Sequence, residues 1–171
     1  METSLRFSSE SKSLRIHARQ KFHLEPDTLS NTLLQVHGEI DTKNGNPSYF
    51  ALLIRQFLPQ LSTRIGVGLQ SDKHRKLQYT VRGKKAFELP SSGYFGLNIK
   101  GRCDLDKEFN KRKDSGGIEL VWSKLNFQRD QDVRLKVGYE LFEKVPYLQL
   151  KENNWTLNAD MKGRWNVRYD L

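Results

Sequence analysis

Side-chain character alternates along most of this 171-residue chain with a period of two residues. For example, Leu14, Ile16 and Phe22 alternate with the basic residues Arg15 and Arg19. Successive side chains of a β-strand lie on opposite faces of the sheet. The alternation therefore predicts strands that have one apolar face and one polar face.

The same pattern recurs to the C-terminus, and turn-forming residues such as Gly, Pro, Asn and Asp separate the runs. No run has the periodicity of an amphipathic helix. We therefore predict an all-β protein with about twelve antiparallel strands, in a range of about ten to twelve, that forms a single domain over residues 1–171. The predicted strands lie near residues 3–8, 13–22, 33–41, 48–58, 61–71, 75–87, 94–104, 117–127, 132–142, 146–153, 154–161 and 164–171. We expect a charged loop at 107–113 and a turn at 114–117.

Composition excludes several classes of protein. Mean hydropathy is −0.71, and the longest purely apolar run is Tyr49–Ile54. A helix needs about 20 apolar residues to cross a bilayer, so a helical membrane protein is excluded. The single cysteine excludes an internal disulfide framework. The N-terminal residues lack the apolar core of a signal peptide, and we expect no cleaved leader.

Strands with one apolar face have two stable arrangements. In a soluble barrel or sandwich the apolar face forms the core. In a transmembrane barrel it meets lipid, and the polar face lines a water-filled lumen. The second arrangement is favoured because about twelve strands exceed the roughly eight whose side chains can fill a barrel. Aromatic residues near strand ends, as in a membrane girdle, also favour it: Trp122, Trp155, Trp165 and Tyr169. We predict a transmembrane antiparallel β-barrel.

The charge of the polar face predicts the sign of the lumen. The chain has 29 Lys and Arg against 20 Asp and Glu, a formal net charge of +9. A narrow tube with excess positive charge concentrates anions. The candidate anion-binding residues in this lumen are Arg15, Arg19, Lys21, Arg64, Lys76, Arg82, Lys84, Lys100, Arg102, Arg134, Lys136, Arg164 and Arg168. The inward acids are fewer: Glu39, Asp41, Asp104, Glu140, Asp160 and Asp170. For any one of these basic residues, a role as the partner of an acid in a lumen ion pair is as good an interpretation as a role in anion binding.

No arrangement of residues points to catalysis. The four histidines are scattered without the spacing of a zinc site. Gly66 and Gly68 lack the third glycine of a dinucleotide-binding loop. We therefore expect no enzyme activity, no metal and no cofactor.

Eight segments of the chain follow a recognisable order over nearly its full length: Met1–Arg6, Pro47–Phe50, Gly66–Leu69, Val81–Lys85, Asn98–Asp104, Phe142–Tyr147, Glu152–Thr156 and Trp165–Leu171. Together these segments resemble the chloroplast outer envelope pore protein 21 family. The resemblance implies a β-barrel in the plastid outer envelope, in chloroplasts or etioplasts, inserted without a cleaved leader. It implies an anion-selective, rectifying pore that passes triose phosphates, 3-phosphoglycerate and inorganic phosphate. It also implies that ATP binds inside the pore, where the candidate basic residues lie, and regulates flux.

The expected partners are membrane lipids, phosphorylated small molecules, phosphate and ATP, with no nucleic acid; a homo-oligomer is left open. The alternative is a soluble basic β-barrel that binds nucleic acid, which the net charge and interleaved aromatic residues also fit. A weaker alternative is a lipocalin-like carrier of an anionic ligand.

Overall fold

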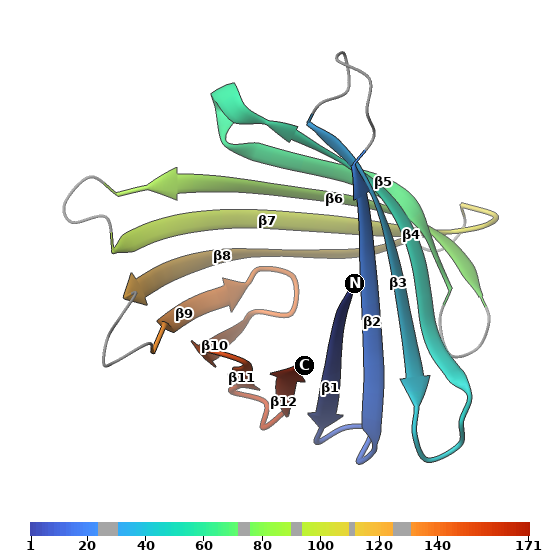
Figure 1. Cartoon of the computed structure of the whole chain (residues 1–171). Coiled ribbons are helices and arrows are strands. Elements are labelled where there is room, and N and C mark those ends of the chain that lie inside the picture. The colour runs from blue at the N-terminus through green and yellow to red at the C-terminus, as the bar shows by residue number, and fades with distance from the viewer. Residues whose placement is uncertain (24–30, 72–75, 90–93, 110–111, 125–130) are drawn as a thin grey trace.

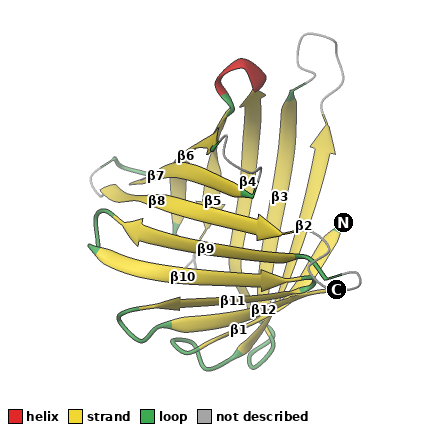
Figure 2. Cartoon of the chain, turned by 90° about the vertical axis from the view of Figure 1, so that its left-hand side faces the viewer, coloured by secondary structure: helices red, strands yellow, loops and turns green. Residues whose placement is uncertain are grey.

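The chain folds into one closed antiparallel β-barrel (Figure 1). The structure, a computed structural model, describes residues 1–23, 31–71, 76–89, 94–109, 112–124 and 131–171. Within this part of the chain there are twelve strands; each pairs with the next in sequence, and the last closes on the first. The N- and C-termini lie close together in both views (Figures 1 and 2). The predicted fold is confirmed.

Most strand boundaries agree with the prediction to within about two residues, which is the normal uncertainty of strand ends. The strands are β1 (Glu2–Ser8), β2 (Leu14–His23), β3 (Thr32–Asp41), β4 (Pro47–Leu58), β5 (Thr63–Ser71), β6 (Leu77–Glu88), β7 (Phe95–Asp106), β8 (Arg112–Lys124), β9 (Val133–Glu140), β10 (Val145–Glu152), β11 (Trp155–Asp160) and β12 (Trp165–Asp170). A short 3-10 helix, η2 (Pro59–Leu61), connects β4 to β5. No helix in the described ranges is long and apolar enough to cross a membrane.

The start of β8 corrects the sequence prediction. The expected charged loop at 107–113 and turn at 114–117 are wrong in part, because β8 begins at Arg112 and runs through both glycines. A Cβ at Gly116 would lie 3.2 Å from the ring of Phe142, and one at Gly117 would lie 3.0 Å from the carbonyl oxygen of Tyr139. These glycines therefore mark close approach within a sheet instead of a turn. Residues 125–127 of the predicted strand lie outside the described residues.

Apolar side chains cover the outside of the barrel, and polar side chains fill the inside. Large exposed hydrophobic residues occur on all twelve described strands or at their ends, whereas the buried hydrophobic residues are Ala51, Leu53 and Val145. The buried polar and charged residues of the described chain are Ser4, Ser13, Thr32, Gln35, Glu39, Asp41, Ser48, Gln70, Thr80, Asp104, Glu119 and Thr156. This distribution is the reverse of a water-soluble barrel and is typical of a barrel that meets lipid.

Aromatic residues pair on the outer face at both ends of the β11–β12 hairpin. The rings of Trp155 and Tyr169 lie 4.7 Å apart between centroids, and those of Phe7 and Trp165 lie 5.8 Å apart. Trp155 begins β11 and Trp165 begins β12, so the two pairs lie at opposite ends of antiparallel strands. This is the placement expected of two aromatic girdles.

A β-bulge in β4 determines which of its residues face inward. The register with β3 shifts between Glu39 and Ile40, which pair with Tyr49 and Pro47. Beyond the bulge, Leu53 is fully buried. A Cβ at Gly68 on β5 would lie 2.8 Å from the Cα of Leu53, so only glycine fits there. The apolar run of β4 therefore has apolar residues on both faces.

Candidate functional site

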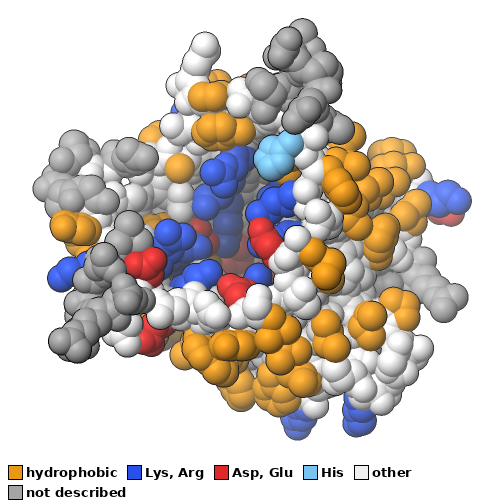
Figure 3. Space-filling view, viewed as in Figure 1, with side chains coloured by type: hydrophobic (Ala, Val, Ile, Leu, Met, Phe, Trp, Pro, Cys, Tyr) orange, Lys and Arg blue, Asp and Glu red, His pale blue; other side chains and the backbone are white. Residues whose placement is uncertain are grey.

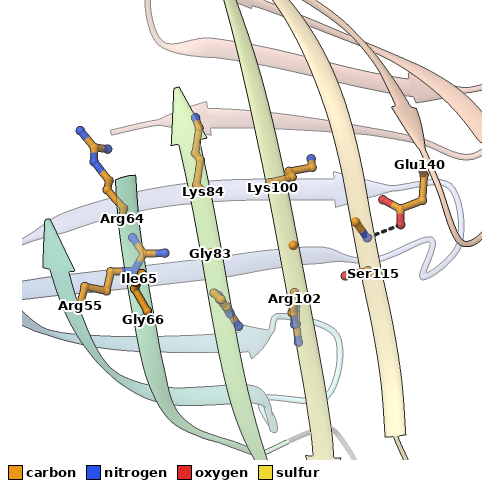
Figure 4. A pocket seen from close by; sticks show the side chains of 13 residues that line it. Arg55, Arg64, Ile65, Gly66, Gly83, Lys84, Lys100, Arg102, Ser115 and Glu140 are labelled. Atoms are coloured by element: carbon orange, nitrogen blue, oxygen red, sulfur yellow. Dashed lines mark hydrogen bonds between the residues drawn. The ribbon is translucent and has the colours of Figure 1, made fainter. Parts of the chain in front are cut away.

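A cavity of about 490 Å³ opens into the lumen against strands β4 to β9 (Figure 4). Its charged lining has a single acid, Glu140. Six basic residues line it, which together we call the cationic wall: Arg55, Arg64, Arg82, Lys84, Lys100 and Arg102. In the space-filling view, Lys and Arg side chains gather in the central hollow, and hydrophobic side chains lie on the outer surface (Figure 3).

Neighbouring strands hold the residues of the cationic wall directly opposite one another. Arg64 on β5 is in register with Lys84 on β6, and Lys84 is in register with Lys100 on β7. Arg82 is likewise in register with Arg102. Paired strands lie about 4.8 Å apart, and like charges in directly opposed positions destabilise a sheet. An anion that enters between these side chains therefore relieves their repulsion.

Only part of the cationic wall is neutralised by protein carboxylates. The Nζ of Lys100 lies 2.7 Å from Oε1 of Glu119, and Arg102 lies 2.6 Å from Asp104. Among the described residues, only Lys100 and Arg102 of the wall form ion pairs, and Arg55, Arg64, Arg82 and Lys84 form none. The wall thus keeps an excess of positive charge that faces the lumen.

A second cavity of about 570 Å³ adjoins the first, because Lys100, Arg102, Ser115 and Glu140 line both. Its charges are mixed: the basic residues are Arg6, Lys100, Arg102, Lys113 and Arg164, and the acids are Glu10, Asp104, Glu119, Glu140, Glu143 and Asp160. The lumen is therefore electrostatically uneven, with one strongly basic side and one balanced side.

The structure divides the predicted lumen residues into groups. Five lie in the cationic wall: Arg64, Arg82, Lys84, Lys100 and Arg102. Five form ion pairs elsewhere in the barrel: Arg15 with Glu39, Arg19 and Lys21 with Glu2, Arg164 with Asp160 and Glu143, and Arg168 with Asp170. On β9, Arg134 donates to Ser123 at 3.1 Å, and Lys136 is half-buried. Lys76 is exposed just before β6.

Sequence reasoning missed Arg55. Both faces of the preceding run, Tyr49–Ile54, are apolar, and the bulge near Ser48 shifts the phase of the alternation. The one signal in the sequence was Gly66 on the next strand, which is in register with Arg55. A Cβ at Gly66 would lie 3.1 Å from the Cγ of Arg55, so the glycine leaves room for the arginine side chain.

The fold brings together two histidines that are distant in sequence. The rings of His17 and His37 lie 5.4 Å apart and nearly perpendicular. In the described part of the chain, no group of three or more His, Cys, Asp or Glu residues could hold a metal ion.

A family profile and three relatives of known name all point to the same protein family. The family profile described as "Chloroplast outer envelope pore protein OEP21" matches residues 3–171. The chain is 53% identical over 171 residues to "Outer envelope pore protein 21A, chloroplastic" of Arabidopsis thaliana. It is 51% identical over 181 residues to "Outer envelope pore protein 21, chloroplastic" of Pisum sativum, and 45% identical over 189 residues to the protein of that name of Oryza sativa subsp. indica. Each alignment covers 100% of both chains.

Proposed function

Because this chain belongs to the chloroplast outer envelope pore protein OEP21 family, we propose that it forms an anion-selective pore in the plastid outer envelope membrane. The family is one of pore proteins, so the chain is a channel and not an enzyme. The resemblance found in the sequence is thereby confirmed. The outward apolar face suits a location in lipid.

The cationic wall is the observation that carries anion selectivity. It places six basic residues around one cavity, with like charges in register across β5, β6 and β7. Low-dielectric walls focus the field of these charges on the pore axis. Anions are therefore concentrated in the lumen and cations are repelled, as in other pores lined by Arg and Lys.

Phosphorylated metabolites fit this lining chemically. Arginine guanidinium groups bind phosphate oxygens with paired N–H donors, and lysine ammonium groups act as point charges. The proposed solutes are triose phosphates, 3-phosphoglycerate and inorganic phosphate. Cavities of about 490 and 570 Å³ that adjoin one another support solutes of this size.

ATP is proposed as the regulatory ligand. Its triphosphate carries more negative charge than a triose phosphate, so it binds the same cations more tightly and competes with smaller anions. Rectification is part of the proposal, and the uneven charge of the two cavities supports it because the field along such a lumen is not uniform.

Reconstitution of the purified protein in a planar bilayer under a KCl gradient tests the proposal. We expect a reversal potential that favours chloride over potassium, and lower chloride conductance when inorganic phosphate or ATP is added. Absence of conductance, or a reversal potential that favours potassium, would overturn the proposal.

The alternative of a soluble barrel that binds nucleic acid gains no support from the placement of the charges. The cations of the cationic wall line an internal cavity, and the exposed surface carries many large apolar side chains. A nucleic-acid surface instead needs its basic residues on an accessible outer face.

A further inference from the structure

Gln70, a neutral residue on β5, lies at the centre of the hydrogen bonds that hold two arginines of the cationic wall. The residue is 5% exposed. Its Oε1 accepts hydrogen bonds from Nη2 of Arg82 at 3.1 Å and from Nη2 of Arg102 at 2.8 Å. The hydroxyl of Tyr49 donates to the same oxygen at 3.2 Å. The amide nitrogen of Gln70 donates to Oε1 of Gln78 at 3.0 Å, which fixes the orientation of the amide.

Two guanidinium groups that converge on a neutral oxygen are unusual, because a partly buried arginine is ordinarily held by a carboxylate. Arg102 has such a partner in Asp104. Arg82 forms no ion pair with any described carboxylate; its other partners are the hydroxyls of Tyr49 and Thr80. An amide carbonyl has a dipole but no net charge, so it orients both guanidinium groups without cancelling their charge.

We infer that Gln70 is a positioning residue of the pore, and that its neutrality makes it a determinant of anion selectivity. The inference rests on the proposed anion pore and adds a residue that touches no solute itself. The amide keeps Arg82 and Arg102 extended along the wall, and it leaves the charge of Arg82, which no described carboxylate pairs, available to a phosphate. A carboxylate at the same position would neutralise Arg82 by forming an ion pair with it.

The substitution Gln70→Glu preserves the shape of the side chain, adds a negative charge and removes the amide donor to Gln78. The new carboxylate would accept the same hydrogen bonds with charge assistance. The stronger bonds from the arginines and the lost bond to Gln78 oppose each other, so we expect the detergent-solubilised barrel to unfold at nearly the same temperature as the wild type. We also expect the ratio of chloride to potassium permeability to fall about fivefold and the affinity for inorganic pyrophosphate to fall about tenfold, since local anion concentration follows the lumen field. A purely structural role would not lower selectivity in a barrel that is equally stable.

Gln149→Glu is the matched control. Gln149 on β10 also lines the lumen, where its amide nitrogen donates to Asn158 on the balanced side, and it forms no hydrogen bond with a described arginine. The variant adds the same charge to the same pore, and we expect less than half of the loss of selectivity seen in Gln70→Glu. An equal loss in the two variants would mean that only total lumen charge matters, and it would overturn the inference.

Gln70→Leu tests positioning without adding a charge. It removes the acceptor for Arg82 and Arg102, so we expect nearly unchanged selectivity but about threefold weaker binding of pyrophosphate. Wild-type pyrophosphate affinity in this variant, or wild-type selectivity in Gln70→Glu, would overturn the inference while the pore proposal stands. A wild-type protein without anion selectivity would instead overturn the proposed function, and this inference with it.

Discussion

The ring of Tyr147 on β10 lies directly over Gly138 on β9. The two residues are in register, and a Cβ at Gly138 would overlap the Cζ of Tyr147 and lie 2.8 Å from its Cε1. Because the glycine leaves this space open, the tyrosine hydroxyl crosses β9 and donates to Oε1 of Glu119 on β8 at 2.7 Å. The same oxygen accepts from Lys100, whose Nζ lies 4.8 Å from the centre of the Tyr147 ring. The space left open by Gly138 on β9 thus allows side chains from β7, β8 and β10 to contact one another.

Gly138→Ala should break this arrangement. The methyl group would displace Tyr147, and buried Glu119 would lose a hydrogen-bond donor. We expect the free energy of unfolding to fall by about 2 kcal/mol, the sum of a lost hydrogen bond and local overpacking. Thermal or urea unfolding of the barrel in detergent measures this change.

Tyr147→Phe provides the comparison, since it removes only the hydroxyl and should cost about 1 kcal/mol. If Gly138→Ala acts through the tyrosine, the double variant should lose less than the sum of the two single variants. Strict additivity would show that the glycine matters for another reason.

Gly68→Ala should lower the stability of the folded barrel far more than Gly101→Ala. A Cβ at Gly68 would overlap the carbonyl oxygen of Leu52 and lie 2.8 Å from the Cα of Leu53, whereas one at Gly101 meets nothing within 4 Å. Backbone atoms cannot move aside cheaply, so we expect a loss of about 3 kcal/mol or more, or failure of the barrel to close. Both glycines lie inside strands, so strand propensity is matched between the variants. The folded fraction after refolding into detergent distinguishes them; similar yields would contradict the prediction.

Lys84→Gln should lower anion selectivity measurably, because Lys84 forms no ion pair within the described chain and faces Arg64 and Lys100 in register. We expect the ratio of chloride to potassium permeability to fall about twofold. Lys43→Gln removes the same charge from the exposed turn between β3 and β4 and should leave the ratio unchanged. Reversal potentials under a salt gradient test both variants. An equal effect of the two substitutions would show that the position of Lys84 in the lumen does not determine its contribution to selectivity.

The turn contact between Glu143 and Arg164 should depend on pH only in acid. The guanidinium of Arg164 donates to Glu143 at 2.7 Å and lowers the pKa of this carboxyl below its ordinary value of 4.5. A carboxyl whose pKa is lowered by folding stabilises the native state above the ordinary pKa, and that stabilisation disappears as pH falls through the folded pKa. The difference in unfolding temperature between wild type and Glu143→Gln should therefore stay constant from pH 7 to about pH 5 and vanish in stronger acid. A difference that instead changes between pH 7 and pH 5 would contradict this assignment.

The limits of the sequence prediction are clear at particular residues. Alternation placed Arg64, Arg82, Lys84, Lys100 and Arg102 on the inner face, and the structure brings all five to one cavity. The same reasoning gave equal weight to Arg15 and Arg168, which the fold pairs with Glu39 and Asp170. Gln70 carried no signal at all, because its role depends on residues from three other strands.

The sequence by itself determined an all-β chain whose strands have one apolar face and one basic face, because strand geometry turns alternation directly into two faces. Only the tertiary structure decided that the barrel closes with its apolar face outward, and which inward cations stay without a carboxylate. That outcome depends on inter-strand register, which shifts at the bulge in β4, and on the close approach of neighbouring side chains at Gly66, Gly68 and Gly138. A shift of one residue in register would exchange the faces of a strand and the partners of every charge on it.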